Sequence, residues 1–251
     1  AGLDDELVPK AERETTGESG WGSIAGRFVF EGDLPTLPPL VTREGDEVAD
    51  ESLIVNPENK GIANVCVYLR RAPDAIHPSL RSVPQEELVF DAKDHRFVPR
   101  LLMVRTGQDV LLKNDEPFMV NMHARTVRNP AFNRALPADE RTGVRVPMPH
   151  PATKYPPLLV VSDVQPWMKA YWIVSDHPYV AVTDADGKFK IEKLPTGEHT
   201  FRVWQERAGS INPIKFQRGL TVTVEAGESI ELPAFKLDAE EFESVSRLRS
   251  P

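Results

Sequence analysis

The sequence predicts an all-β protein. Short segments in which apolar and polar residues alternate are typical of strands with one buried face, and Ser23–Phe30 and Lys188–Ile191 are clear examples. The chain also contains 23 prolines and 15 glycines among its 251 residues, which favours many turns and few long helices. Hydrophobic residues make up 40% of the chain and charged residues 27%, as in soluble globular proteins. A chain of this length and composition can bury a stable core.

The predicted strands fall into three groups along the chain. The first group holds Ser23–Phe30 and Val65–Leu69, after which Ala72–Glu86 has the composition of a connector. The strands of the second group are predicted at Leu101–Val104, Val110–Lys113, Met119–His123, Gly143–Met148, Leu158–Ser162 and Ala170–Val174, with an irregular stretch holding a short helix at Asn129–Arg141. The third group is predicted at Tyr179–Thr183, Lys188–Ile191, His199–Trp204, Leu220–Val224 and Ile230–Phe235.

Both ends of the chain are polar. Residues 1–20 show no sustained periodicity and are predicted to be a tail. Asp238–Arg247 is acidic at its start and basic at its end, which suits the dipole of a short helix. An isolated helix of this length is marginal, so we expect it to require a surface to pack on.

Charge and cysteine content exclude several classes of function. The net charge of −8 argues against nucleic-acid binding, which requires a basic face. No apolar run approaches the roughly 18 residues that a membrane-spanning helix needs. Cys66 is the only cysteine, so the chain has no intrachain disulfide and no cysteine cluster for a metal. We expect its side chain to be buried, as free cysteines commonly are.

One short motif has the spacing of a metal-binding loop without its ligands. Ser162, Gln165 and Met168 are three residues apart, which is the spacing of Cys, His and Met in one type of blue-copper loop. Upstream, Val120 precedes Asn121 where such a site normally carries a His before an Asn. A hydroxyl and a neutral amide are poor copper ligands, and valine offers no donor atom. Only the thioether of Met168 is retained, so the sequence predicts no metal and no cofactor at this position.

These residues and an ordered series of further matches carry a resemblance to a known family. The chain resembles the methylamine-utilisation-like cupredoxin proteins, which join a cupredoxin to a carboxypeptidase-regulatory-like β-sandwich. The matching stretches are Phe97-Val98-Pro99, Val104-Arg105-Thr106-Gly107-Gln108, Phe132-Asn133, Pro166-Trp167-Met168, Asp176-His177-Pro178-Tyr179, Val182-Thr183-Asp184-Ala185-Asp186-Gly187 and Val203-Trp204. Gln205 and Arg100 stand where relatives often carry His, so the resemblance does not extend redox activity to this chain.

The resemblance implies an architecture of two units. A cupredoxin-like Greek-key sandwich is expected to be inserted into a transthyretin-like, carboxypeptidase-regulatory-like β-sandwich formed by both chain ends. Such an insertion is tolerable because closing a longer loop costs entropy only logarithmically. The expected parts are an N-terminal tail at 1–20, a split sandwich at 21–71 and 176–236, a connector at 72–85, a cupredoxin-like domain at 86–175, and a C-terminal tail or short helix at 237–251.

The resemblance also implies a location and a role. Relatives are extracytoplasmic, and the chain begins at Ala1 without Met, so we expect a periplasmic or otherwise extracytoplasmic protein whose leader has been removed. We expect a non-catalytic accessory subunit, not an enzyme, that binds protein partners in a larger assembly such as a membrane-bound electron-transfer complex. Two alternatives stay open: a redox or metal-binding protein with a rebuilt site, and a carbohydrate- or ligand-binding module.

Other candidate sites follow from individual side chains. His123, His150 and Asp163 are candidates, with Met168, for a replacement metal site, although ordinary hydrogen-bonded histidines explain the pattern more simply. Ser162, His123 and Asp163 are the residue types of a hydrolytic triad, but the sequence offers no nucleophile turn and no oxyanion site.

The remaining candidates concern a turn and an interface. Asp184 and Asp186 resemble calcium-loop residues, yet a tight turn explains them, because no glutamate closes a twelve-residue loop. Trp167, Phe242 and Val245 are the candidate interface residues, Trp167 because its loop lies at the end of the unit where redox partners of cupredoxins dock.

Overall fold

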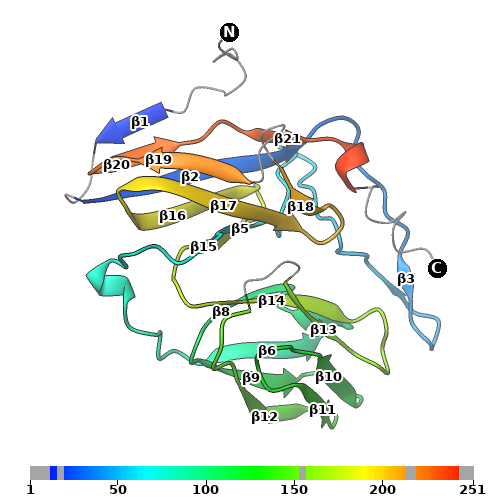
Figure 1. The fold of residues 1–251 in the computed structure, drawn as a ribbon. Helices are drawn as coiled ribbons and strands as arrows, with labels where there is room; N and C mark the ends of the chain where they lie inside the picture. The colour runs from blue at the N-terminus through cyan, green and yellow to red at the C-terminus, as the bar shows by residue number, and fades with distance from the viewer. Residues whose placement is uncertain (1–11, 16–19, 153–156, 213–218, 243–251) are drawn as a thin grey trace. The chain divides into compact units, whose positions relative to one another are not determined.

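The computed structural model describes residues 12–15, 20–152, 157–212 and 219–242, and it is built almost entirely of strands. The prediction of an all-β fold is confirmed. The chain divides into two compact units (Figure 1). The first comprises residues 1–36, 51–79 and 179–251, and the second comprises residues 37–50 and 80–178.

The first unit contains two sheets. Its central strand, β2, alternates between buried and half-buried positions along its whole length, as the sequence pattern predicts. Phe28 on this strand packs against Phe189 and Phe235 in the core of the unit. One sheet has the order β1 (Glu12–Thr15), β20 (Glu228–Glu231), β2 (Trp21–Phe30) and β16 (Lys188–Pro195), and β21 (Phe235–Leu237) also pairs with β2. The other has the order β15 (Val180–Val182), β5 (Cys66–Leu69), β17 (Gly197–Gln205) and β18 (Gly209–Ile211), and β19 (Leu220–Val224) also pairs with β17.

The second unit is a sandwich of two further sheets. Its core lies between them and includes Phe90, Phe132 and the fully buried Trp172, whose indole contacts both rings. The first sheet has the order β11 (Phe132–Leu136), β10 (Val120–Ala124), β13 (Leu158–Val161), β14 (Lys169–Ser175) and β8 (Leu101–Arg105). The second has the order β12 (Glu140–Pro147), β9 (Asp109–Asn114), β6 (Leu88–Lys93) and β7 (Arg96–Val98). A hairpin of β3 (Leu40–Val41) and β4 (Glu47–Val48) also belongs to this unit, although it lies within 21–71, which is predicted to be part of the split sandwich.

A close approach between two turns ties together distant parts of the first unit. Asp186 accepts hydrogen bonds from the side-chain amides of Asn56 (3.1 Å) and Asn59 (2.6 Å). A Cβ atom on Gly61 would lie 2.1 Å from the Asp186 carbonyl carbon, so this contact requires glycine. Asp184 Oδ1 accepts from the backbone N–H groups of Asp186 and Lys188, which makes these aspartates turn residues.

Several predicted elements were wrong in their local detail. Residues 12–15, predicted as part of a tail, form β1 and pair antiparallel with β20. The short helix predicted within Asn129–Arg141 is instead the strand β11, which pairs with β10. The single strand predicted at Ile230–Phe235 is divided into β20 and β21, because proline at position 233 removes a ladder donor between them.

The described chain ends in a short helical segment. Residues 239–242 are helical. The Asp238 carboxylate accepts from the Glu240 N–H (2.9 Å), and the Glu241 carboxylate accepts from the Asp238 N–H (3.0 Å), which is a reciprocal capping arrangement. Among the described residues, no helix has the length and apolar character needed to span a membrane. A 3₁₀ turn, η2 (Pro78–Leu80), lies in the segment predicted to be a connector.

Candidate functional site

The structure brings the four residues of the ligand-like pattern into one region of the second unit. Val120 begins β10 and is completely buried in the core cluster, together with Met168. Ser162 and Gln165 lie in the loop between β13 and β14 and are 3% and 8% exposed. Two backbone hydrogen bonds close this loop, from Ser162 N–H to Met168 O (3.0 Å) and from Met168 N–H to Gln165 O (2.9 Å).

The polar side chains of this loop are hydrogen-bonded to one another. The Ser162 hydroxyl lies 2.7 Å from Gln165 Oε1 and 2.9 Å from Asn121 Oδ1, and its single proton is donated to these acceptors. Its oxygen accepts in turn from the Gln165 backbone N–H (3.0 Å). Gln165 Nε2 donates to the Met119 carbonyl (3.1 Å), which joins the loop to the residue before β10. The amide and the hydroxyl are therefore used in holding the loop closed.

Asn121 is the centre of the network. Its Oδ1 accepts from the backbone N–H groups of Asp163 (2.9 Å) and Val164 (3.3 Å), in addition to the Ser162 hydroxyl. Its Nδ2 donates to Asn133 Oδ1 (3.0 Å) and to an Asp163 oxygen (2.9 Å). In the sequence, Asn121 stands out only as the neighbour of Val120, the vacated ligand position. The signal for its role was an amide residue in a predicted strand next to Val120, because a buried amide must find hydrogen-bond partners in a neighbouring segment.

Asp163 links three segments through its carboxylate. His123 Nδ1 lies 2.9 and 3.0 Å from the two carboxylate oxygens, and Asn133 Nδ2 donates to the same group at 2.9 Å. The hydrogen bond from His123 lowers the pKa of the Asp163 carboxyl below its usual range, and the bonds from Asn133 and Asn121 act in the same direction. This arrangement fixes the loop to β10 and β11.

The donor set does not fit copper. Val120 has no donor atom, Ser162 and Gln165 present a protonated hydroxyl and a neutral amide, and the Met168 thioether alone is a weak ligand. The candidates for a replacement site do not converge either. Within the described parts of the chain, no three or more His, Cys, Asp or Glu side chains are grouped so as to hold a metal ion. His150 is exposed, and its backbone exchanges two hydrogen bonds with the Asn129 side chain.

The residues of the imagined hydrolytic triad are close in space but not connected as a triad. His123 is bonded to Asp163, as a triad requires. The Ser162 hydroxyl, however, is bonded to Asn121 and Gln165. A nucleophilic serine must donate to the imidazole, so these contacts give no catalytic assembly.

The candidate interface residues differ in their environments. Trp167 is half-buried and packs against the core cluster of the second unit. Phe242 was proposed as an interface residue, but it is only 3% exposed and stacks on Phe30 with ring centroids 5.8 Å apart, so it is a core residue of the first unit. Val245 lies outside the described residues.

Two further side chains, those of Tyr171 and Cys66, have packing roles. Tyr171 is buried on β14, next to the core residue Trp172. Cys66 is completely buried, as predicted, and burial raises the pKa of its thiol.

Comparisons with known proteins give a likeness to part of the chain only. No family model matches, and no curated protein matches in sequence. A Cu-containing nitrite reductase from Thermus scotoductus SA-01 is similar at 17% identity and a TM-score of 0.32, over 42% of this chain and 25% of that one. A purple cupredoxin from Nitrosopumilus maritimus is similar at 15% identity and a TM-score of 0.29, over 36% of this chain and all of that one. Amicyanin from Paracoccus versutus is similar at 12% identity and a TM-score of 0.31, over 43% of this chain and 97% of that one. The chain thus spans a quarter of the length of the nitrite reductase, and likenesses of this size carry no argument about function.

Proposed function

We propose that this protein is a non-catalytic, extracytoplasmic accessory subunit that docks on a protein of a larger assembly, such as a membrane-bound electron-transfer complex. The observation that supports this most is the hydrogen-bonded loop at Ser162–Met168. Side chains that stand where copper ligands are expected are used to fix the loop. A fixed loop presents its outward-facing residues with little loss of conformational entropy on binding.

The proposed docking surface consists of Met119, Pro166 and Trp167. Met119 is 44% exposed although it is large and apolar, and Pro166 is exposed beside the half-buried Trp167. The bond from Gln165 Nε2 to the Met119 carbonyl brings the two segments together. Adjacent apolar and aromatic side chains on a rigid backbone are typical of the central contacts of protein interfaces.

Metal analysis tests the non-catalytic part of the proposal. The protein as isolated is expected to contain no stoichiometric copper and to lack an intense visible absorption band. The triple variant Val120→His, Ser162→Cys, Gln165→His restores the donors of a blue-copper site around Met168 and is expected to gain both. Stoichiometric copper with intense colour in the unaltered protein would overturn the proposal and favour the rebuilt redox site.

Affinity capture from native membranes tests the docking part. The unaltered protein is expected to recover a defined partner, and Met119→Asp is expected to reduce that recovery at least tenfold. Val144→Asp is the matched control, because Val144 is a partly exposed apolar residue on β12, in the other sheet of the unit. Recovery of the free chain alone, or equal losses in both variants, would contradict docking through this surface.

A further inference from the structure

Strand β17 changes neighbours along its length. Its C-terminal part, Phe201–Trp204, pairs with β5, whereas Gly197–Phe201 pairs with β19 on the opposite side. On the β5 side the last backbone bond runs from Arg70 N–H to Thr200 O at 2.9 Å. Beyond Arg70 the chain leaves β17, so no strand of the described part of the chain covers this edge of the N-terminal part of β17.

The alternation of backbone groups shows which of them face this edge. In an antiparallel pair, the N–H and C=O groups of one residue point to the same side, and successive residues alternate. Because Thr200 O faces β5, the Thr200 N–H and both backbone groups of Glu198 face that side as well. No described strand or side chain pairs with these three groups. They form the main-chain half of a β-ladder without its partner strand.

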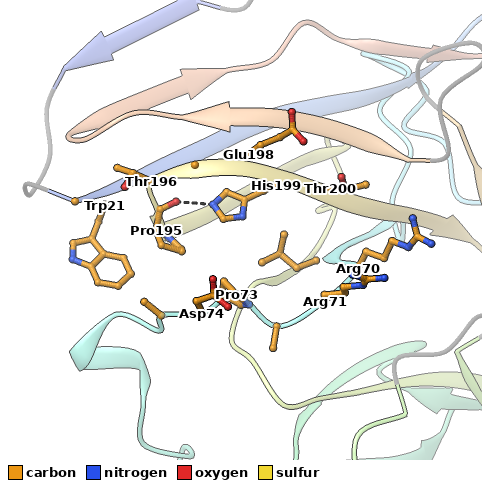
Figure 2. A pocket seen from close by; sticks show the side chains of 15 residues that line it. Trp21, Arg70, Arg71, Pro73, Asp74, Pro195, Thr196, Glu198, His199 and Thr200 are labelled. Carbon is orange, nitrogen blue, oxygen red and sulfur yellow. Dashed lines mark hydrogen bonds between the residues drawn. The ribbon is translucent and has the colours of Figure 1, made fainter.

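A groove of about 770 Å³ lies along this open edge (Figure 2). One wall is the chain from Leu69 to Ala75, and the other is Pro195–Thr200. His199 faces the groove, and its Nε2 donates to the Pro195 carbonyl at 2.6 Å. Trp21 lines the groove near Pro195, held edge-on against His77 with ring centroids 4.9 Å apart.

The groove is cationic at one end. Arg70 and Arg71 are both exposed, and Figure 2 shows their guanidinium groups at the end opposite Trp21. Neither guanidinium has an ion-pair partner among the described residues. Glu198 also lines the groove, but its side chain is directed away from His199 in Figure 2. Asp74 lies across from His199 and gives the middle of the groove a carboxylate.

We propose that this groove binds an extended peptide segment of a partner protein, which adds as a strand to the open edge of β17. Main-chain hydrogen bonds to Glu198 and Thr200 hold the peptide, and an acidic side chain or terminal carboxylate of the peptide binds Arg70 and Arg71. The open edge of four residues spans about 13 Å at ~3.3 Å per residue, which accommodates a short paired segment. An apolar side chain of the peptide contacts Trp21. This site lies within the first unit and does not depend on the docking surface at Met119.

Selection from random displayed hexapeptides tests the proposal with a defined probe. Enriched peptides are expected to carry a carboxylate, and the double variant Arg70→Ala, Arg71→Ala is expected to weaken their binding at least tenfold. Arg202→Ala is the matched control, since Arg202 lies on the same strand but outside the groove. Failure to enrich any peptide, or enrichment of peptides that bind the double variant equally well, would overturn the proposal.

A second pair of variants tests strand addition separately from charge. Glu198→Pro removes one of the two N–H groups that face the groove, the other being that of Thr200, and leaves the bonds of Gly197 and His199 to β19 intact. Glu198→Pro is expected to lower the affinity for the selected peptide at least tenfold, whereas Glu198→Ala, which retains the N–H, is expected to change this affinity less than twofold. Equal effects of the two variants would show that the backbone edge is not used.

Amide hydrogen exchange gives a readout that does not depend on variants folding. In the free protein the amides of Glu198 and Thr200 are expected to exchange at least tenfold faster than that of His199, which faces β19. Adding the selected peptide is expected to slow hydrogen exchange at the amides of Glu198 and Thr200 and to leave exchange at His199 unchanged. Strong protection of these two amides in the free protein, or no change on addition, would contradict an open edge.

Discussion

The loop at Ser162–Met168 and the groove beside β17 satisfy their polar groups in opposite ways. In the loop, Asn121 and Gln165 are hydrogen-bonded on both the donor and acceptor sides of their amides. In the groove, the backbone groups of Glu198 face an edge that no described strand covers. A region that completes its own hydrogen bonds stabilises the fold, and a region that leaves them unpaired is able to bind. The loop, which the sequence indicated as a site, therefore has fewer free hydrogen-bonding groups for a partner than the groove has.

The largest effect expected from this comparison is at Asn121. Asn121→Ala removes the acceptor shared by the buried Ser162 hydroxyl and the part-buried backbone N–H groups of Asp163 and Val164. We expect a loss of about 3 kcal/mol in the free energy of unfolding, measured by urea denaturation. A loss below about 0.5 kcal/mol would show that the loop does not depend on this amide.

A smaller loss is expected at Ser162. Ser162→Ala removes one buried hydroxyl, and Gln165 Oε1 loses its donor, so the free energy of unfolding should fall by about 1.5 kcal/mol. Ser162→Cys is the control of similar shape and should recover part of this loss. If both variants are as stable as the unaltered protein, the hydrogen bond from Ser162 makes no measurable contribution to the free energy of unfolding.

The lowered pKa of Asp163 predicts that the stability of the fold depends on pH in the acidic range. Its folded-state pKa is lowered, chiefly by His123, so the stability that it contributes is present above the unfolded carboxyl pKa of about 3.9 and is lost as the pH falls through the folded value. Asp163→Asn should therefore flatten the fall in Tm on acidification below about pH 4.

Asp91 is the natural comparison for this titration. Burial raises its pKa, and Asp115 adds to the effect, so its contribution has the opposite sign: it is lost as the pH rises through the folded value. Asp91→Asn should leave the fall below pH 4 in place. Identical pH profiles for the unaltered protein and Asp163→Asn would contradict the role given to His123.

The smallest effect is expected in the groove. Thr196→Ala changes an exposed side chain that makes no hydrogen bond to the described residues, so the free energy of unfolding should change by less than about 0.5 kcal/mol. Urea denaturation beside Asn121→Ala measures the contrast directly. A loss of stability as large as that of Asn121→Ala would contradict the view that side chains of the loop stabilise the fold and those of the groove do not.

The elements that the sequence predicted well are those with one buried face. The alternation at Ser23–Phe30 and Lys188–Ile191 survives in the structure because each strand has a core side and an outer side there. The strand β11 escaped prediction because its three central residues are all exposed and so show no alternation. The polar residues of β1 gave no signal either, since that strand is recognised only by its pairing with β20.

The candidate sites were predictable to a similar extent. The spacing of Ser162, Gln165 and Met168 placed them correctly in one loop. The groove could not be anticipated, because Arg70 and Glu198 are distant in the sequence and meet only through the pairing of β5 with β17. The packing of Phe242 on Phe30 is likewise a contact between the two ends of the chain, which no local pattern encodes.

The way in which the chain passes between its two units has a consequence for biosynthesis. The second unit takes most of its strands from the continuous stretch Leu80–Pro178, so both its sheets can assemble as soon as that stretch has been made. Strand β2 is made much earlier, yet its partners β16, β20 and β21 are among the last to be synthesised. Its unpaired edges must remain available throughout translation of the inserted unit, when nascent chains are prone to misassembly. A nascent chain of this kind would benefit from a chaperone bound to residues 21–30 until translation is complete.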